Sequence, residues 1–351
     1  MGVKKYNFIE RFLTKSVFWS RFYYFFMGYT MLRWFIFLFY PISFSQKRSI
    51  LKYFWYKIIS PNSTVMEIFI CPSYVCQLNC KHCCEEKLDS SIFLTTEEIK
   101  KIIDDFHNFL HGFHITFCSG EVLLRNDLME LISYAFNKGI FSSIVTNGLL
   151  LSDEKIKELK RAGASQIVVS IDHPDRDKHD ELRGYKGCYD KALVGLKKSI
   201  ENGFNTLIWT YVSAFNENDL EKLRLMGEEL GVSGIVVLFV ALSGKMTYKD
   251  NLTFHEREKI RNKIKYPIRL EFPTEKMKCV GGGVKHIAVL PTGEITPCPS
   301  VSCSYGNIRK DNLKEVFVRL KKDCVKFNNE FTGQCMINNP KYREAHIIRK
   351  S

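Results

Sequence analysis

From position 65 to about position 240, short runs of apolar residues alternate with longer segments in which apolar residues recur every three or four positions. The short runs are typical of strands buried on both faces of a sheet, and the longer segments are typical of amphipathic helices. The predicted strands are 65–70, 113–118, 141–146, 166–171, 206–213 and 234–240. The predicted helices are 96–110, 126–137, 153–162, 189–201 and 218–230. This strict alternation predicts an α/β fold, a partial (β/α)6 TIM-like barrel with its chemistry at the carboxyl ends of the strands.

The pattern changes after about position 250. Residues 287–297, with the sequence IAVLPTGEITP, predict a small hairpin whose turn is Pro291-Thr292-Gly293. Five of the twelve cysteines lie in this last part of the chain. We therefore expect an N-terminal helical, aromatic and basic segment at 1–60, the barrel at 61–250, and a cysteine-rich hairpin extension at 251–351.

Charged and aromatic residues are concentrated at the N-terminus. Of 51 Lys and Arg and 38 Asp and Glu, ten cations and one acid fall within residues 1–60, which leaves 41 minus 37, or +4, for the rest of the chain. The same segment holds 21 of the 47 Phe, Trp and Tyr residues. The body of the protein is therefore not basic enough to predict a nucleic-acid partner, whereas aromatic and cationic residues together are typical of a membrane–water interface.

Two uncharged runs, 22–32 and 34–46, are separated by Arg33. Neither run reaches the roughly 20 apolar residues that span a bilayer, and cations lie on both sides of the pair. We expect residues 17–46 to lie in the membrane interface, with a single span and a helical extension packed on the barrel as the alternatives. This prediction places the protein in the cytoplasm, peripherally on the inner face of the cell membrane.

Three cysteines lie close together after the first predicted strand, in the pattern Cys76-x3-Cys80-x2-Cys83. Such close neighbours have poor geometry for forming disulfides with one another. Three thiolates from one loop suit a cubane iron–sulfur cluster whose fourth iron stays open. His82 would complete a zinc site on paper, although neighbours in one tight loop cannot easily aim four groups tetrahedrally. Thiolate sites of this kind need a reducing compartment, which favours the cytoplasm.

Polar motifs follow the next three predicted strands. They are CSGEVLLR at 118–125, TNG at 146–148, and SID at 170–172 with HDELRG at 179–184. Together with the cysteine motif, this set resembles the radical S-adenosylmethionine (SAM) enzymes over about residues 65–244. The resemblance implies a [4Fe-4S] cluster that binds SAM, formation of a 5′-deoxyadenosyl radical, and an electron donor such as flavodoxin or ferredoxin.

The resemblance also implies roles for individual residues. The matches to the cluster ligands are Cys76, Cys80 and Cys83, and the matches to SAM-binding positions are Gly120, Glu121, Ser170, Asp172 and Arg183. The first two of these belong to a turn whose backbone meets the amino group of SAM, and the other three approach its ribose or carboxylate. Two features depart from the family: SGEV replaces the usual GGEP at 119–122, and His82 stands at a usually aromatic position.

The C-terminal cysteines resemble the SPASM/twitch extension of radical SAM enzymes. The pattern Cys279-x13-Gly293-x4-Cys298 is followed by a GNI motif at 306–308 and by further cysteines. The resemblance implies a second, auxiliary [4Fe-4S] cluster. Its implied ligands are Cys279, Cys298 and Cys335, with Cys303 or Cys324 as the fourth. A zinc site made by the same thiolates is the alternative.

The substrate is the open question. We expect a radical SAM enzyme that modifies an unactivated C–H bond of a membrane-associated, lipid-like substrate, because the N-terminal segment would hold the barrel mouth near the acyl layer. The alternative is a peptide- or protein-modifying maturase, since many members with SPASM-like extensions act on peptides. A non-catalytic iron–sulfur scaffold is a third interpretation, and the intact matches to SAM-binding positions argue against it.

Overall fold

One curved sheet forms the centre of the computed structural model. The structure describes residues 42–84, 91–239, 245, 256, 259–260, 268–270, 281–283, 285–301, 303–330 and 339. Within them the strands are β1 (Glu67–Ile70), β2 (His114–Phe117), β3 (Phe141–Thr146), β4 (Gln166–Ser170), β5 (Asn205–Val212), β6 (Gly234–Phe239), β7 (Ile268–Leu270), β8 (His286–Val289) and β9 (Ile295–Thr296). Their order is β7-β6-β5-β4-β3-β2-β1-β8-β9, and β8 with β9 is the antiparallel pair.

The six strands predicted for the barrel are all present, and their ends differ from the predicted ends by at most two residues. They form consecutive parallel pairs from β1 to β6, which confirms the partial TIM-like barrel. The predicted C-terminal hairpin is present as β8 and β9. In addition, β8 pairs in parallel with β1, so the hairpin continues the sheet of the barrel.

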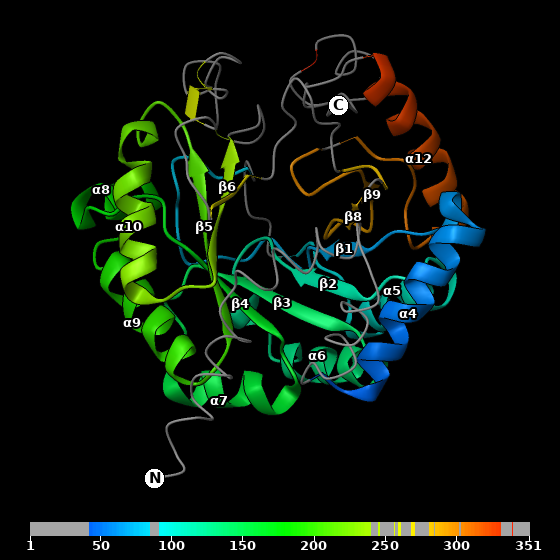
Figure 1. Cartoon of the computed structure of the whole chain (residues 1–351), viewed down its shortest axis with the longest axis horizontal. Helices are drawn as coiled ribbons and strands as arrows, with labels where there is room; N and C mark the ends of the chain where they lie inside the picture. The colour runs from blue at the N-terminus through cyan, green and yellow to red at the C-terminus, as the bar shows by residue number, and fades with distance from the viewer. Residues whose placement is uncertain are drawn as a thin grey trace, which may run out of the picture.

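Helices cover the outer face of the sheet, as Figure 1 shows. They are α4 (Phe44–Ile59), α5 (Thr96–Phe109), α6 (Leu128–Asn137), α7 (Asp153–Ala162), α8 (Arg176–Arg183), α9 (Cys188–Glu201), α10 (Leu220–Leu230) and α12 (Leu313–Glu330). The five helices predicted for the barrel correspond to α5, α6, α7, α9 and α10, and α4 lies within the N-terminal segment that is predicted to be helical, whereas α8 and α12 are additional. Each helix of the barrel connects two neighbouring parallel strands, so the strands all present their carboxyl ends at one edge.

The strand β1 is buried on both faces, because its residues alternate between two apolar layers. On β1, Ile68 and Ile70 belong to the large core beneath the helices. Phe69, and Cys71 just after the strand, belong instead to a smaller cluster that includes Trp209 of β5 and lines the inner face of the sheet. Polar side chains also lie along the strands, and Oγ1 of Thr116 on β2 donates to the carboxylate of Glu67 on β1 at 2.7 Å. The residues of the sequence motifs, in contrast, lie at or after the carboxyl ends of the strands.

The helix α4 packs on the amino-terminal edge of the sheet. Its Tyr53 ring meets Phe113 edge-on with the centroids 5.3 Å apart, and Oγ of Ser49 donates to O of Lys138 at 3.2 Å. Phe113 directly precedes β2 and Lys138 lies shortly before β3. This helix therefore covers the end of the barrel opposite the carboxyl ends of the strands.

Most of the predicted membrane-interface segment, residues 1–41, lies outside the described residues. In the part of the chain that the structure describes, no helix has both the length and the apolar character to cross a membrane.

Candidate functional site

The loop after β1 gathers the three motif cysteines at the carboxyl edge of the sheet. Cys76, Cys80 and Cys83 belong to one small apolar cluster. The amide of Lys81 donates to O of Leu182 at 2.8 Å, which ties this loop to α8. Burial raises the pKa of the Cys76 thiol to about 11. A metal bound by this sulfur must therefore displace its proton.

Two side chains from outside this loop, one on α8 and one after β3, donate to these sulfurs. Nη1 of Arg183, at the end of α8, lies 3.9 Å from Sγ of Cys80. Nδ2 of Asn147, which follows β3, lies 3.9 Å from Sγ of Cys76. Donors and positive charge directed at sulfur stabilise the thiolate form and tune the potential of a cluster that thiolates hold.

Asp172, two residues after the end of β4, is the centre of a buried charge network. Its Oδ2 lies 2.6 Å from Nη2 of Arg183 and 3.2 Å from Nε2 of His82. Its Oδ1 accepts from the amide of Tyr211 at 3.0 Å. Burial alone would raise the pKa of Asp172, but Arg183, His82 and His179 outweigh burial and hold the pKa well below its usual value. The carboxylate is therefore charged, and it links the cysteine loop to α8.

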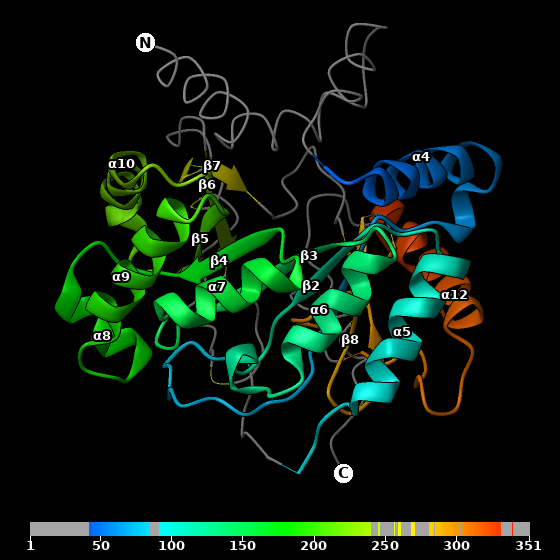
Figure 2. The ribbon, with the colours of Figure 1, turned by 90° about the horizontal axis from the view of Figure 1, so that it is seen from below.

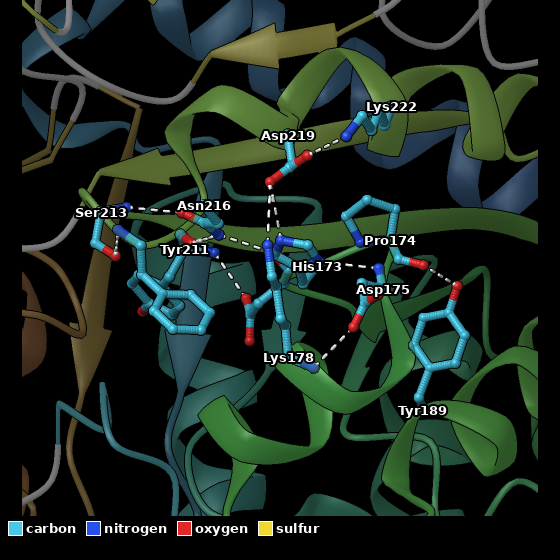
Figure 3. Close-up of polar contacts among 12 residues, drawn as sticks. His173, Pro174, Asp175, Lys178, Tyr189, Tyr211, Ser213, Asn216, Asp219 and Lys222 are labelled. Carbon is cyan, nitrogen blue, oxygen red and sulfur yellow. Dashed lines mark hydrogen bonds and ion pairs between the residues drawn. The ribbon is translucent and has the colours of Figure 1, made fainter.

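A second group of contacts fixes the loops after β4 and β5, as Figure 3 shows. Nδ2 of Asn216 donates to O of Asp172 at 2.7 Å and to O of Tyr211 at 2.8 Å. Nε2 of His173 lies 3.1 Å from Oδ2 of Asp219. These contacts join the ends of two neighbouring strands and hold Asp172 in place.

The turn after β2 packs directly against the cysteine loop. Ser119 has φ +75° and Gly120 has φ +59°, both in the left-handed region. A Cβ atom at Gly120 would lie 2.4 Å from O of Val75, and the amide of Glu121 donates to the same oxygen at 2.8 Å. Glycine is required here because the two backbones approach too closely for any side chain.

The carboxylate of Glu121 ties this turn to the TNG motif. It accepts from Oγ1 of Thr146 and from the amide of Asn147, each at 2.8 Å, and from the amide of Leu123 at 3.1 Å. Burial raises the pKa of Glu121, and these donors act against that effect. The side chain is thus committed to contacts within the protein, and it sets the position from which Asn147 reaches Cys76.

Ser170 is the last residue of β4 and is half-buried. Within the described residues its hydroxyl makes no hydrogen bond, and Nε of Arg183 is buried without a partner. The site therefore contains polar groups that can still take a ligand, beside a carboxylate and a guanidinium that already contact each other.

Comparisons with known proteins match this arrangement. Residues 70–226, which carry the contacts above, match the model of the Radical SAM superfamily. The chain is 28% identical over 278 residues to the AdoMet-dependent heme synthase of Methanosarcina barkeri, covering 69% of this chain and 79% of that protein. It is 26% identical over 257 residues to the PqqA peptide cyclase of Bradyrhizobium diazoefficiens, covering 68% and 66%. The crystal structure of Streptococcus suis SuiB bound to precursor peptide SuiA shares the fold, with a TM-score of 0.62 at 17% identity over 74% of this chain and 66% of that one. The chain belongs to the radical SAM superfamily.

A radical SAM enzyme uses a [4Fe-4S] cluster and SAM, and the residues described above fit both groups. Three thiols lie in one loop, donors face two of them, and Nε of Arg183 lacks an acceptor. In the described ranges, no three His, Cys, Asp or Glu side chains meet at the position of one metal ion. A cubane does not need such a meeting point, because each thiolate binds a different iron.

The predicted ligands of an auxiliary cluster are only partly within the described residues. Cys279 and Cys335 lie outside them. Cys303 and Cys324 are buried in the main apolar core, and Cys298 packs against it half-buried. Cys324 lies on α12, whereas the other two follow the hairpin. The cysteines that bind an auxiliary cluster in this radical SAM enzyme therefore stay a prediction.

The GNI motif has a local structural reason. Gly293 of the hairpin turn has φ +85°, and its carbonyl oxygen accepts from the amide of Ile308 at 2.8 Å. Nδ2 of Asn307 donates to O of Thr292 at 3.0 Å. These contacts hold the turn between β8 and β9 against the segment that follows Cys303.

The sequence does not indicate the contacts that two residues make at the site. Asn147 belongs to a motif without a predicted role of its own, and His82 is considered as a zinc ligand and as a departure from the family, but not as a partner of Asp172. In the structure, Asn147 contacts the sulfur of Cys76, and His82 contacts the carboxylate of Asp172. The sequence offers one indication of these roles: each residue lies within a motif, Asn147 in TNG and His82 between Cys80 and Cys83.

We expect Gly120→Ala to weaken SAM binding by the reconstituted enzyme at least tenfold, because a Cβ would meet O of Val75 at 2.4 Å and push the turn away from the cysteine loop. Gly231→Ala is the matched control. Gly231 also has a positive φ, +76°, but a Cβ there meets nothing within 4 Å. Equilibrium SAM binding measures the effect, and equal losses in both variants would refute the role of the close approach.

Proposed function

We propose that this radical SAM enzyme modifies an unactivated C–H bond of a peptide or protein. The observation that carries the proposal is the position of the site, at the edge of the sheet opposite the edge that α4 covers. The similarity to a PqqA peptide cyclase and to SuiB, whose structure holds a precursor peptide, supports the same substrate class.

The interpretation as a lipid-modifying enzyme required the N-terminal segment to hold the barrel mouth near the acyl layer. The part of that segment that the structure describes is α4, and it packs on residues that precede β2 and β3. The cysteine loop and Asp172 instead follow the carboxyl ends of β1 and β4. A bilayer bound at α4 would therefore lie at the wrong end of the barrel to deliver an acyl chain to the site.

In this proposal Cys76, Cys80 and Cys83 hold the SAM-binding [4Fe-4S] cluster, which together with SAM supplies the radical that abstracts hydrogen from the substrate. Arg183 keeps a positive charge beside Cys80, and Asp172 fixes the direction of its guanidinium. The free Nε of Arg183 and the hydroxyl of Ser170 donate to SAM. The turn at Gly120 and Glu121 offers its backbone to the amino group of SAM.

We also propose that a second [4Fe-4S] cluster lies at the C-terminal cysteines, with Cys279, Cys298 and Cys335 as ligands and Cys303 or Cys324 as the fourth. The cysteine pattern and the similarity to peptide-modifying relatives support an auxiliary cluster, with zinc as the alternative. The enzyme works in the cytoplasm and receives its electron from a flavodoxin or a ferredoxin.

Transfer of deuterium tests the substrate class without knowledge of the substrate. Cells that carry the gene are grown on deuterated medium, and their extract is divided into a peptide and protein fraction, a lipid fraction and a tetrapyrrole fraction. Each fraction is incubated anaerobically with the reconstituted enzyme, dithionite and unlabelled SAM. We expect 5′-deoxyadenosine to gain deuterium only with the peptide and protein fraction, and to lose the label when that fraction is first digested with a protease. Deuterium obtained from the lipid or the tetrapyrrole fraction instead would overturn the proposal.

A further inference from the structure

The helix α4 presents a row of large apolar side chains to solvent. Their exposed fractions are 83% for Phe44, 39% for Leu51, 63% for Trp55, 77% for Ile58 and 54% for Ile59. The spacing of these positions, seven, four, three and one residues, places them along one side of the helix. An apolar row of this length on the surface marks an interaction site more often than a free surface. We call these five residues the α4 stripe.

The side of α4 opposite the stripe fixes the helix to the barrel, and it carries the buried residues Gln46, Ser49, Ile50 and Tyr53. On the flank of the helix, Tyr56 stacks on His111 with the ring centroids 3.6 Å apart, and Nζ of Lys52 donates to O of His107 at 3.1 Å. The stripe is therefore a rigid surface. Ser43 and Gln46 form a capping box that defines the start of the helix. Figure 2 shows α4 on the outside of the molecule near α5 and α12. The stripe faces away from the contacts that hold the helix.

The charges of α4 indicate the chemistry of its partner. The helix contains four cations, Lys47, Arg48, Lys52 and Lys57, and no acidic residue. Arg48 is exposed and lies between Phe44 and Leu51 of the stripe. Tryptophan and branched apolar side chains beside cations are typical of helices that lie in the headgroup region of an anionic bilayer.

We propose that the α4 stripe binds the surface of an anionic phospholipid bilayer and holds the enzyme with the carboxyl edge of its sheet turned toward water. The orientation follows from the contacts of α4, which lie at the amino-terminal edge of the strands. A substrate then reaches the cysteine loop from the aqueous phase. This inference concerns the attachment of the protein and does not depend on the identity of the substrate.

Photocrosslinking from the stripe identifies its occupant. Ile58 of the full chain is replaced by p-benzoylphenylalanine, and the protein is irradiated with vesicles of phosphatidylcholine and phosphatidylglycerol. We expect a crosslink to phospholipid. The same replacement at Leu225, which is 52% exposed on α10, should give none. A crosslink from position 58 to a second copy of the chain, or to residues 1–41 of the same chain, would overturn the proposal.

Flotation with the same vesicles measures the contribution of the stripe to binding. We expect Trp55→Ser with Ile58→Ser to lower the vesicle affinity of the full chain about tenfold or more, because two large apolar groups no longer leave water. Val194→Ser with Leu225→Ser is the matched control, since these side chains are 50% and 52% exposed on other helices. Reductive SAM cleavage without substrate should be the same in both variants, which shows that they are folded. Equal flotation of both variants would show that the stripe does not bind the bilayer.

Discussion

Replacing Cys76, Cys80 and Cys83 together by alanine is expected to abolish the formation of 5′-deoxyadenosine from SAM. The variant loses every thiolate that holds the SAM-binding cluster in our proposal, and no neighbouring side chain can replace three ligands. Anaerobic reconstitution should accordingly load about four fewer irons per chain than the unchanged protein, which we expect to hold about eight. Iron analysis and chromatography of the nucleoside products measure both effects.

Cys84→Ala is the matched control for this variant. Cys84 is half-buried in the same loop, directly after Cys83, but lies outside the motif. We expect this variant to keep its full iron content and its SAM cleavage. If the triple variant still cleaves SAM reductively, the cluster lies elsewhere, and the roles assigned to Arg183 and Asn147 fail with it.

Asp172→Asn is expected to destabilise the protein by about 3 kcal/mol or more, because it leaves the buried guanidinium of Arg183 without a counter-charge. Arg183 is 8% exposed, and Asp172 is the carboxylate with which it forms an ion pair among the described residues, at 2.6 Å. Urea unfolding of the metal-free protein under anaerobic conditions measures the loss. In a double-mutant cycle with Arg183→Met, the double variant should lose less unfolding free energy than the two single variants lose together.

The ion pair of Lys81 with Glu181 is the matched control for this cycle. It also joins the cysteine loop to α8 at 2.6 Å, but its side chains are 58% and 54% exposed. We expect Glu181→Gln to cost less than about 1 kcal/mol, because water already solvates both charges. Additive losses for Asp172 and Arg183 would contradict the view that their contact organises the site.

The barrel could be predicted from the sequence because its strands and helices are set by local burial patterns. A strand buried on both faces reads as a short apolar run, and β3 and α7 have the ends that the pattern predicts. Residues 176–183, which form α8, contain a single large aliphatic side chain, Leu182, so no apolar periodicity marks this short helix. Residues 44–59 lie within the segment 1–60, for which the sequence predicts a membrane interface or a helical extension, and in the structure one side of this helix packs on the barrel.

The sequence alone determined the order of strands and helices, the loop that carries Cys76, Cys80 and Cys83, and the family that these motifs resemble. These features depend on residues that are neighbours in the chain. The tertiary structure decided which distant groups meet: Asp172 with His82, the pairing of β8 with β1, and the position of α4 at the edge opposite the site. Such contacts join segments that can be more than 200 residues apart, as β1 and β8 are. They depend on the order of the strands in the sheet, which no local pattern of apolar and polar residues specifies.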